Sequence, residues 1–251
     1  HHGAVLRSHC VRGRSAMNLD TGKLRALTLD LDDTLWPIWP TIARAESALQ
    51  AWLQRHAPRV TERFDLAAMR ADREAVARER PDWAHDLSAL RRESIRRLLV
   101  AAGETEALLD AAFSVFLAER QRVDLYADSL PALQRLAARW PLFALSNGNA
   151  DLVRIGLQPW FRGSLAAREF GVGKPDPRIF AAACERLRCA PNEVLHVGDD
   201  LRLDVHGALD AGMQAAWVRR DGEAGKDDDI GSGVRCWQGP DLLALADRLG
   251  V

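Results

Sequence analysis

Two kinds of hydrophobic pattern alternate along this chain. Short apolar runs predict buried strands at 24–31, 142–145, 193–197 and 214–218, with a weaker candidate at 164–168. Apolar residues at helical spacing predict helices near 128–139, 150–157, 177–187, 204–211 and 241–249. This alternation of strands and helices predicts an α/β fold, a doubly wound parallel sheet of Rossmann-like type with helices on both faces.

The segment from 39 to 123 has a different character, because no strand pattern interrupts it. Helical spacing is found at 41–56, 62–79, 85–102 and 105–121, with Pro58, Pro81 and Gly103 between these stretches. We therefore predict a catalytic core of residues 23–38 and 124–251 and an inserted, all-helical cap of residues 39–123. Residues 1–22 are interpreted as an N-terminal extension that begins with a tag-like His1-His2, and the Gly- and Asp-rich stretch 221–233 as a mobile loop.

Composition excludes several classes of protein and partner. The apolar fraction is 47%, the charged fraction 27% and the formal net charge −1, so nothing drives the chain electrostatically toward nucleic acid or a membrane. No apolar run approaches the roughly 18 residues that span a bilayer, and we expect a cytoplasmic protein, monomeric or weakly dimeric. The four cysteines, at 10, 184, 189 and 236, have no metal-binding spacing and are predicted to be reduced and structural. A small molecule is the expected partner.

Polar residues gather where three of the predicted strands end. Asp30 and Asp32 follow the first strand, and two positions apart on an extended segment they point the same way. One can serve as nucleophile and the other as proton donor, although an acid after a strand can also cap the next helix. Ser146 and Asn147 follow the second strand, where a hydroxyl and free backbone N–H groups suit a phosphate oxygen or form an ordinary turn.

Two further features complete the set. Lys174 lies between a glycine and a proline, which limit its loop to a few conformations, although a loop lysine can also be solvated. Asp199, Asp200 and Asp204 crowd one strand-to-helix turn, where a hard cation such as Mg²⁺ would relieve their repulsion and helix capping is the alternative. Carboxylates, a hydroxyl, a lysine and more carboxylates at one sheet edge are what phosphoryl transfer requires.

These residues also resemble a known family. The segments 29–35 (LDLDDTL), 146–148 (SNG), 173–175 (GKP) and 198–200 (GDD), together with Asp204, are similar to the four motifs of the haloacid dehalogenase-like (HAD) hydrolases. The helical insertion after the first motif resembles the C1 cap of that superfamily. The wording of the motifs is closest to that of family members that dephosphorylate flavin mononucleotide (FMN) and a phosphoribityl precursor of riboflavin.

The resemblance implies a Mg²⁺-dependent phosphatase of small phosphorylated metabolites. It implies that Asp30 attacks phosphorus and binds Mg²⁺, and that Asp32 acts as acid and base and offers its backbone carbonyl to the metal. Asp199 would bind Mg²⁺ directly, with Asp200 or Asp204 acting directly or through water. Ser146 and Asn147 would hold phosphate oxygens, and Lys174 would neutralise charge on the nucleophile and the phosphoryl group.

Other functions remain open at this point. A haloacid dehalogenase of the same fold also uses an aspartate nucleophile, but releasing halide needs no proton donor in the place of Asp32. A phosphomutase uses the same residues and differs in how its cap excludes water. A non-catalytic regulatory module would be expected to lack one of the catalytic residues.

Substrate choice is expected to depend on the cap. Trp36 and Trp39 closely follow the nucleophile and could stack on a flat ring, and Arg92 could bind in the same pocket. The alternative is that the tryptophans fill the seam between core and cap and that the arginine belongs to a solvated helix face.

Overall fold

The computed structural model describes residues 18–220, 230–231 and 233–251. Its six strands are β1 (Ala26–Leu29), β2 (Leu142–Ser146), β3 (Gly163–Ala166), β4 (Val194–Gly198), β5 (Gln214–Val218) and β6 (Cys236–Gly239). They form one sheet in the order β3-β2-β1-β4-β5-β6, and every neighbouring pair is parallel. The predicted α/β fold with a parallel sheet is confirmed.

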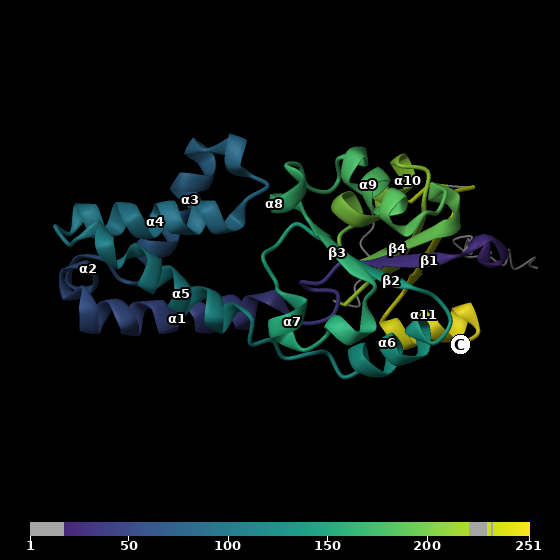
Figure 1. Cartoon of the computed structure of the whole chain (residues 1–251), viewed down its shortest axis with the longest axis horizontal. Coiled ribbons are helices and arrows are strands. Elements are labelled where there is room, and N and C mark those ends of the chain that lie inside the picture. Colours follow the sequence, from purple (N-terminus) through teal and green to yellow (C-terminus); the bar gives the residue numbers. More distant parts are fainter. Residues whose placement is uncertain (1–17, 221–229, 232) are drawn as a thin grey trace, which may run out of the picture.

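Helices cover both faces of this sheet (Figure 1). The helices of the sheet region are α6 (Ser129–Ala137), α7 (Leu152–Ile155), α8 (Ala167–Phe170), α9 (Pro177–Leu187), α10 (Gly207–Asp210) and α11 (Leu242–Leu249). Side chains of α6 and α11 pack on one face, and those of α9 and α10 on the other. Every residue of β1, β2, β4 and β5 is buried, as expected for strands of a parallel sheet covered on both sides.

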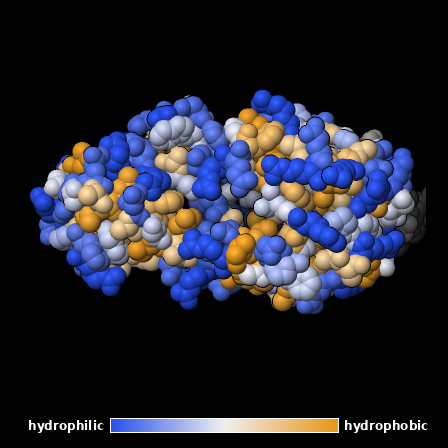
Figure 2. Space-filling model, in the orientation of Figure 1, coloured by the Kyte–Doolittle hydropathy of each residue, from blue (hydrophilic) through white to orange (hydrophobic). Residues whose placement is uncertain are grey.

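A second group of helices extends from the end of β1 to the region before β2 and lies beside the sheet region (Figure 1). These helices are α1 (Ile38–His56), α2 (Pro58–Arg63), α3 (Leu66–Glu79), α4 (Leu87–Ala101) and α5 (Leu109–Arg120). They share their own hydrophobic cluster, built from residues such as Leu53, Ile95 and Phe116. The exact boundaries of cap and core stay a prediction. Figure 2 shows hydrophilic residues gathered on the visible face where this group of helices meets the sheet region.

Three details differ from the sequence-based expectation. The helix expected over 62–79 is divided, because Phe64 is extended and the side chain of Asp65 accepts the N–H of Ala68 to begin α3. The helix expected from 204 begins earlier, as a π-helical turn over Leu201–His206. Strand β6 was not predicted, because four residues are too few to establish a period. Residues 1–17 and most of the expected mobile loop, 221–229 and 232, lie outside the described part.

None of the helices in the described part is both long and apolar enough to cross a membrane. Cys184, Cys189 and Cys236 are free thiols, and Cys10 lies outside the described residues. Burial raises the pKa of the Cys184 thiol to about 11 and that of Cys236 to about 12. These two thiols are therefore protonated near neutral pH and are poor nucleophiles.

Candidate active site

The site is centred where the order of the strands reverses. β1 and β4 are neighbours in the sheet although more than a hundred residues separate them, and Asp30 and Asp199 follow their carboxyl ends. The backbone N–H of Asp30 donates to the carbonyl of Val197 at 2.9 Å, which continues the ladder one residue beyond β1. In open α/β sheets this reversal point is the usual place for a ligand.

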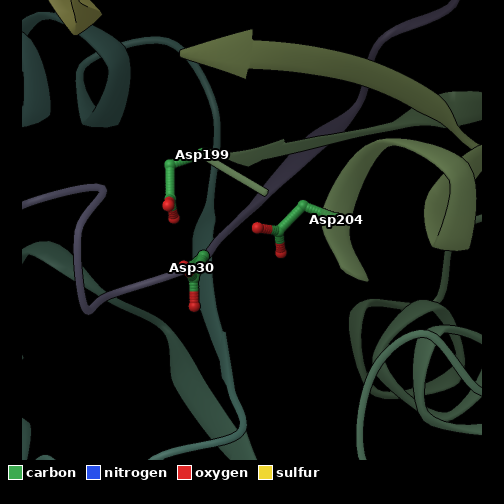
Figure 3. Close-up of side chains that lie close together, drawn as sticks. All are labelled: Asp30, Asp199 and Asp204. Atoms are coloured by element: carbon green, nitrogen blue, oxygen red, sulfur yellow. The ribbon is translucent and has the colours of Figure 1, made fainter. Parts of the chain in front are cut away.

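Three carboxylates converge at this point. Asp30, Asp199 and Asp204 each offer an oxygen, and these oxygens lie within 4.8 Å of one another. Figure 3 shows the three side chains directed toward a shared space from the ends of β1 and β4 and from the π-helical turn. Asp30 is 8% exposed and Asp204 only 1%, so water cannot offset their mutual repulsion.

Lys174 is the positive group at the centre of this cluster. Its Nζ donates to Asp30 Oδ1 at 2.8 Å and to Asp204 Oδ1 at 2.6 Å. Burial alone would lower the pKa of Lys174, but the charges of Asp204 and Asp30 outweigh it and raise that pKa above its ordinary value. Burial alone would raise the pKa of Asp204, yet Lys174 and His196 hold it below the usual range. Lys174 and Asp204 therefore form a charged pair.

At the other two carboxylates burial outweighs the favourable contacts, although Lys174 also binds Asp30. Burial raises the pKa of Asp30 well above its usual value, and burial together with the charge of Asp204 raises that of Asp199 to about 6. One ammonium group faces three carboxylates, so negative charge is left unbalanced. A hard divalent cation such as Mg²⁺, which prefers oxygen ligands, fits both the donor set and the missing charge.

Asp204 also contacts a buried histidine, His196. The Nε2 of His196 lies 2.8 Å from Asp204 Oδ1, and its Nδ1 lies 2.8 Å from the hydroxyl of Thr28. Burial lowers the pKa of His196, so the ring is neutral near neutral pH. An ionised carboxylate can only accept, so we assign the proton to Nε2, which leaves Nδ1 to accept from Thr28.

Asp32 lies outside the carboxylate cluster and faces the cap. Both of its carboxylate oxygens accept from Nη2 of Arg120 at 2.7 Å, and its Oδ1 also accepts from Nε1 of Trp36 at 2.9 Å. Arg120 is the last residue of α5 and is 1% exposed. The side chain expected to act as acid and base is thus held in one orientation by a core indole and a cap guanidinium.

The loop after β2 and the loop between α8 and α9 are joined by reciprocal hydrogen bonds. Asn147 Nδ2 donates to the carbonyl of Lys174 at 2.9 Å, and the N–H of Lys174 donates to Asn147 Oδ1 at 2.8 Å. Ser146 Oγ accepts the N–H of Gly148 at 2.9 Å. In this structure Asn147 acts on the site through Lys174, and the phosphate contacts expected of Ser146 and Asn147 stay predictions.

Glycine at 148 permits a close approach of this loop to the acid. A Cβ at Gly148 would lie 2.5 Å from Asp32 Oδ2 and 3.2 Å from Arg120 Nη2. The first distance is shorter than real Cβ contacts, so a larger residue would displace Asp32 or the loop.

The three residues expected to influence substrate choice lie in different surroundings. Trp36 is fully buried and reaches the site through its hydrogen bond to Asp32. Trp39 is 56% exposed, with the guanidinium of Arg70 4.8 Å from the centre of its ring. Arg92 pairs with Asp110 at 2.5 Å and lies over the ring of Phe113. A role of these residues in specificity stays a prediction.

Asp200 and Thr34 have roles that follow from their contacts. Asp200 Oδ1 accepts the N–H groups of Arg202 and Leu203, so this residue caps the π-helical turn, as the structural alternative anticipated. The hydroxyl of Thr34 lies 3.2 Å from Asp30 Oδ2 and 3.0 Å from Asp199 Oδ1, and it bridges two of the carboxylates.

Sequence reasoning missed Arg120, His196 and Thr28. Arg120 is indistinguishable in the sequence from the many other arginines of the helical block. The signal for His196 was a polar residue inside an otherwise apolar strand, shortly before the acids. A buried polar residue requires a partner, and here that partner is Asp204.

The sequence model of the haloacid dehalogenase-like hydrolases matches residues 24–212. The chain belongs to this family. It is 38% identical over 202 residues to 5-amino-6-(5-phospho-D-ribitylamino)uracil phosphatase YigB of Escherichia coli (strain K12), and the match covers 79% of this chain and 84% of that protein. It is also 32% identical over 223 residues to a phosphoserine phosphatase of Thermus thermophilus, over 78% of this chain and 89% of that one.

Among solved structures, a 2-haloacid dehalogenase from Pseudomonas syringae pv. Tomato DC3000 superposes with a TM-score of 0.81 at 35% identity. The match covers 90% of this chain and 98% of that chain. The predicted HAD membership and the predicted enzyme class, a phosphatase, are confirmed by the family model and the curated relatives.

Proposed function

We propose that this enzyme is a Mg²⁺-dependent phosphomonoesterase that works through a phosphorylated Asp30, with FMN or a phosphoribityl flavin precursor as its substrate. The observation that carries the proposal is the imbalance of charge at the strand ends. One buried ammonium, that of Lys174, faces the three converging carboxylates of Asp30, Asp199 and Asp204, while Asp32 is held apart from them. That arrangement supplies a nucleophile, a cation site and a separate acid.

In the first step an oxygen of Asp30 forms a bond to phosphorus and the bond from phosphorus to the ester oxygen breaks. Asp32 donates a proton to that oxygen, and an alcohol leaves. In the second step Asp32 takes a proton from water, whose oxygen forms a new bond to phosphorus and releases Asp30. Lys174 offsets negative charge on Asp30 and on the phosphoryl group throughout.

We assign the metal to Asp30, the backbone carbonyl of Asp32, Asp199 and Asp204. When bound, Mg²⁺ would offset charge on the phosphoryl oxygens and on these carboxylates. Asp204 has a second task, because its Oδ1 accepts from both Lys174 and His196 and so orients the ammonium toward Asp30. Ser146 and Asn147 are assigned to the phosphate oxygens.

The substrate assignment rests on the relative from E. coli, which is described as a phosphatase of 5-amino-6-(5-phospho-D-ribitylamino)uracil. That compound is an ester of a sugar alcohol and carries a pyrimidinedione ring. The likeness covers 79% of this chain and 84% of that protein, so it includes most of the segment that forms the helices between β1 and β2. Those helices contact Asp32 through Arg120, so they face the alcohol that Asp32 would protonate.

A dehalogenase is the second candidate, because the solved structure at 35% identity is described as a 2-haloacid dehalogenase. The position and contacts of Asp32 argue against this activity. A halide leaves without a proton, so that reaction has no use for a carboxyl group held beside the leaving group. It also has no use for a cation site formed by three converging carboxylates.

The test is phosphate release with and without Mg²⁺ from p-nitrophenyl phosphate, FMN, 5-amino-6-(5-phospho-D-ribitylamino)uracil and several sugar phosphates. A 2-haloacid serves as the dehalogenase control, with halide release as its readout. We expect Mg²⁺-dependent phosphate release, the highest kcat/KM for one of the two flavin-related esters, and no halide. Halide release without phosphate release would replace this proposal with the second candidate.

A further inference from the structure

A cavity of about 220 Å³ lies between cap and core beside Asp32, and none of the three clustered carboxylates is among its lining residues. Asp32 and Asn149 line it from the core, and Arg73, Arg91, Phe116 and Arg120 line it from the cap. We refer to it as the arginine pocket. Because Asp32 is the proposed proton donor to the leaving oxygen, the alcohol half of the substrate extends from that oxygen toward this pocket.

Arg120 is an anchored donor at the boundary of the pocket. Its Nη2 binds Asp32, and its Nε donates to Asn149 Oδ1 at 2.9 Å, so the plane of the guanidinium is held on two sides. Its remaining nitrogen, Nη1, is buried and has no hydrogen-bond partner among the described residues. Buried donors almost always have a partner, so an unpaired one held rigidly beside a cavity points to a missing acceptor.

Arg73 supplies a second donor of the same kind from α3. Its Nε is buried without a partner in the described part of the chain. Burial lowers the pKa of Arg73, and burial together with the charge of Arg73 lowers that of Arg91 to about 10. Guanidinium groups are thus crowded here in surroundings that solvate them poorly.

The acids that contact these arginines do not balance them. Glu46 lies near Arg70 and Arg91, and Asp32 binds Arg120. Among the described residues, the four guanidinium groups of Arg70, Arg73, Arg91 and Arg120 therefore share two carboxylates, those of Glu46 and Asp32. An occupant with acceptor oxygens would satisfy the free N–H groups and, if negative, would also reduce the excess charge.

We propose that the arginine pocket binds the head group of the leaving alcohol through at least two acceptor oxygens, with Arg73 and Arg120 as the donors. This inference rests on the proposed phosphatase function and adds a specificity site to it. Two head groups present such a pair of oxygens: the carbonyl edge of a pyrimidinedione ring and a carboxylate. The apolar lining by Ile42, Leu87 and Phe116 suits the face of a flat ring.

The size of the pocket limits the head group further. Its volume of about 220 Å³ is below the roughly 300–1,000 Å³ of pockets that enclose drug-sized ligands. A single ring or a short acid is enclosed in such a space, whereas a three-ring flavin would extend out of it. We therefore expect the single-ring ester to be a better substrate than FMN.

The experiment compares esters that differ only in the head group. One pair is 5-amino-6-(5-phospho-D-ribitylamino)uracil and ribitol 5-phosphate, which lacks the ring. The second pair is phosphoserine and phosphoethanolamine, which lacks the carboxylate. Each is assayed with the wild type, Arg73→Gln and Arg78→Gln, an exposed arginine on the same helix that serves as the matched control. Phenyl phosphate, which has a ring but no acceptor oxygens on it, reports the chemistry without a head group of this kind.

We expect Arg73→Gln to lower kcat/KM about tenfold or more for the head-group-bearing ester of one pair, because a hydrogen bond from a charged donor is lost. Its truncated partner and phenyl phosphate should change less than about twofold, since neither carries the acceptor oxygens of the head group. Arg78→Gln should match the wild type throughout. A selective loss in the first pair identifies the pyrimidinedione, and one in the second pair the carboxylate.

Arg73→Lys and a binding measurement keep the test decisive. Lysine retains the charge but lacks the Nε–H, so the selective loss should persist even if Arg73→Gln does not fold. Calorimetric binding of the dephosphorylated 5-amino-6-(D-ribitylamino)uracil and of serine does not depend on turnover, and at least one should bind the wild type and weaken in both variants. Equal losses of kcat/KM on all substrates, or unchanged binding in both Arg73→Gln and Arg73→Lys, would contradict the proposal that the arginine pocket binds the head group. Failure of the wild type to release phosphate from any ester, with binding as expected, would overturn only the proposed reaction.

Discussion

The carboxylate cluster of the core and the arginine pocket between cap and core share no residue and have opposite charge. In the core, one ammonium faces three carboxylates, whereas in the cap four guanidinium groups share two. In the core, Asp30 and Asp199 are positioned by neighbouring strands of one sheet. The arginines of the cap extend from three helices, α3, α4 and α5. The core therefore lacks a cation and the cap lacks an acceptor.

This difference explains how one fold can keep its chemistry and change its substrate. Strand ends in a parallel sheet are fixed by backbone hydrogen bonds, so Asp30 and Asp199 keep their spacing whatever the cap contains. Side chains on helix surfaces can be exchanged at little cost to the fold, so the cap is where specificity can vary. Asp32 belongs to both regions, because it follows β1 and is bound by Arg120 of the cap.

The largest expected effect is that of removing the nucleophile from the core. Asp30→Asn should lower phosphate release by about 10⁴-fold or more, because loss of a nucleophile removes the covalent route. A steady-state assay with p-nitrophenyl phosphate measures this. Asp247→Asn, an exposed acid paired with Arg135, is the control and should behave as the wild type. Activity retained by Asp30→Asn would mean that the nucleophile is another residue and that the carboxylate cluster is not the site of phosphoryl transfer.

The next largest effect concerns the residue that the two regions share. Asp32→Asn should lower kcat/KM on ribitol 5-phosphate by about 10²–10⁴-fold, the usual contribution of a general acid. We compare kcat/KM because it reports the first phosphoryl transfer, in which the leaving group departs, and not the later hydrolysis that all esters share. With p-nitrophenyl phosphate the loss should be smaller, because that leaving group departs without protonation. The ratio of the two losses is the measurement. Equal losses on both esters would show that Asp32 acts through structure and not as a proton donor.

A smaller effect is expected where the core loop closely approaches the acid. Gly148→Ala places a Cβ 2.5 Å from Asp32 Oδ2, and the resulting displacement should lower kcat about 10²-fold. The control is Gly22→Ala, whose nearest heavy atom would be Asp20 Oδ1 at 3.8 Å. Both variants should show cooperative thermal unfolding. Full activity of Gly148→Ala would mean that Asp32 can move without loss, contrary to its three hydrogen bonds.

The smallest expected effect is the change of Mg²⁺ affinity with pH, which depends on the charge of the carboxylate cluster. Burial raises the pKa of Asp199 to about 6, so below that pH the carboxyl is protonated and must lose its proton before it binds a cation. The affinity for Mg²⁺ should therefore fall as the pH falls through about 6, by up to about tenfold per unit for each proton released. Calorimetric titration on both sides of that pH measures it.

The arginine pocket provides the control for this titration. Arg73→Gln should show the same dependence of Mg²⁺ affinity on pH as the wild type, because Arg73 contacts neither Asp199 nor Lys174 among the described interactions. An affinity for Mg²⁺ that does not change with pH would contradict the assignment of Asp199 as a ligand. A changed profile in Arg73→Gln would show that the two regions are coupled.

Much of the core could be predicted from the sequence because its signals are local. A buried parallel strand is a continuous apolar run, and polar residues directly after β1, β2 and β4 therefore had to meet at one edge. The parallel α/β sheet and the helical insertion were correctly predicted on this basis, and the family was correctly predicted from the resemblance of the motifs. The structure brings Asp30, Lys174, Asp199 and Asp204 together as expected. Strand β6 and the division of α2 from α3 were missed because both depend on a few residues only.

Only the tertiary structure decided which partners these residues have. Nothing in the order of residues distinguishes Arg120 and Arg73 from the exposed arginines of the cap helices, because burial and the loss of solvent arise when helices pack. The same holds for the contact of His196 with Asp204 and of Trp36 with Asp32, which join an apolar strand and a turn to the site. The sequence alone determines which polar groups follow each strand, because the regular backbone pairing of a parallel sheet requires a continuous apolar run that ends where the strand ends. The charge balance around Asp32, by contrast, depends on contacts between segments that are distant in the sequence.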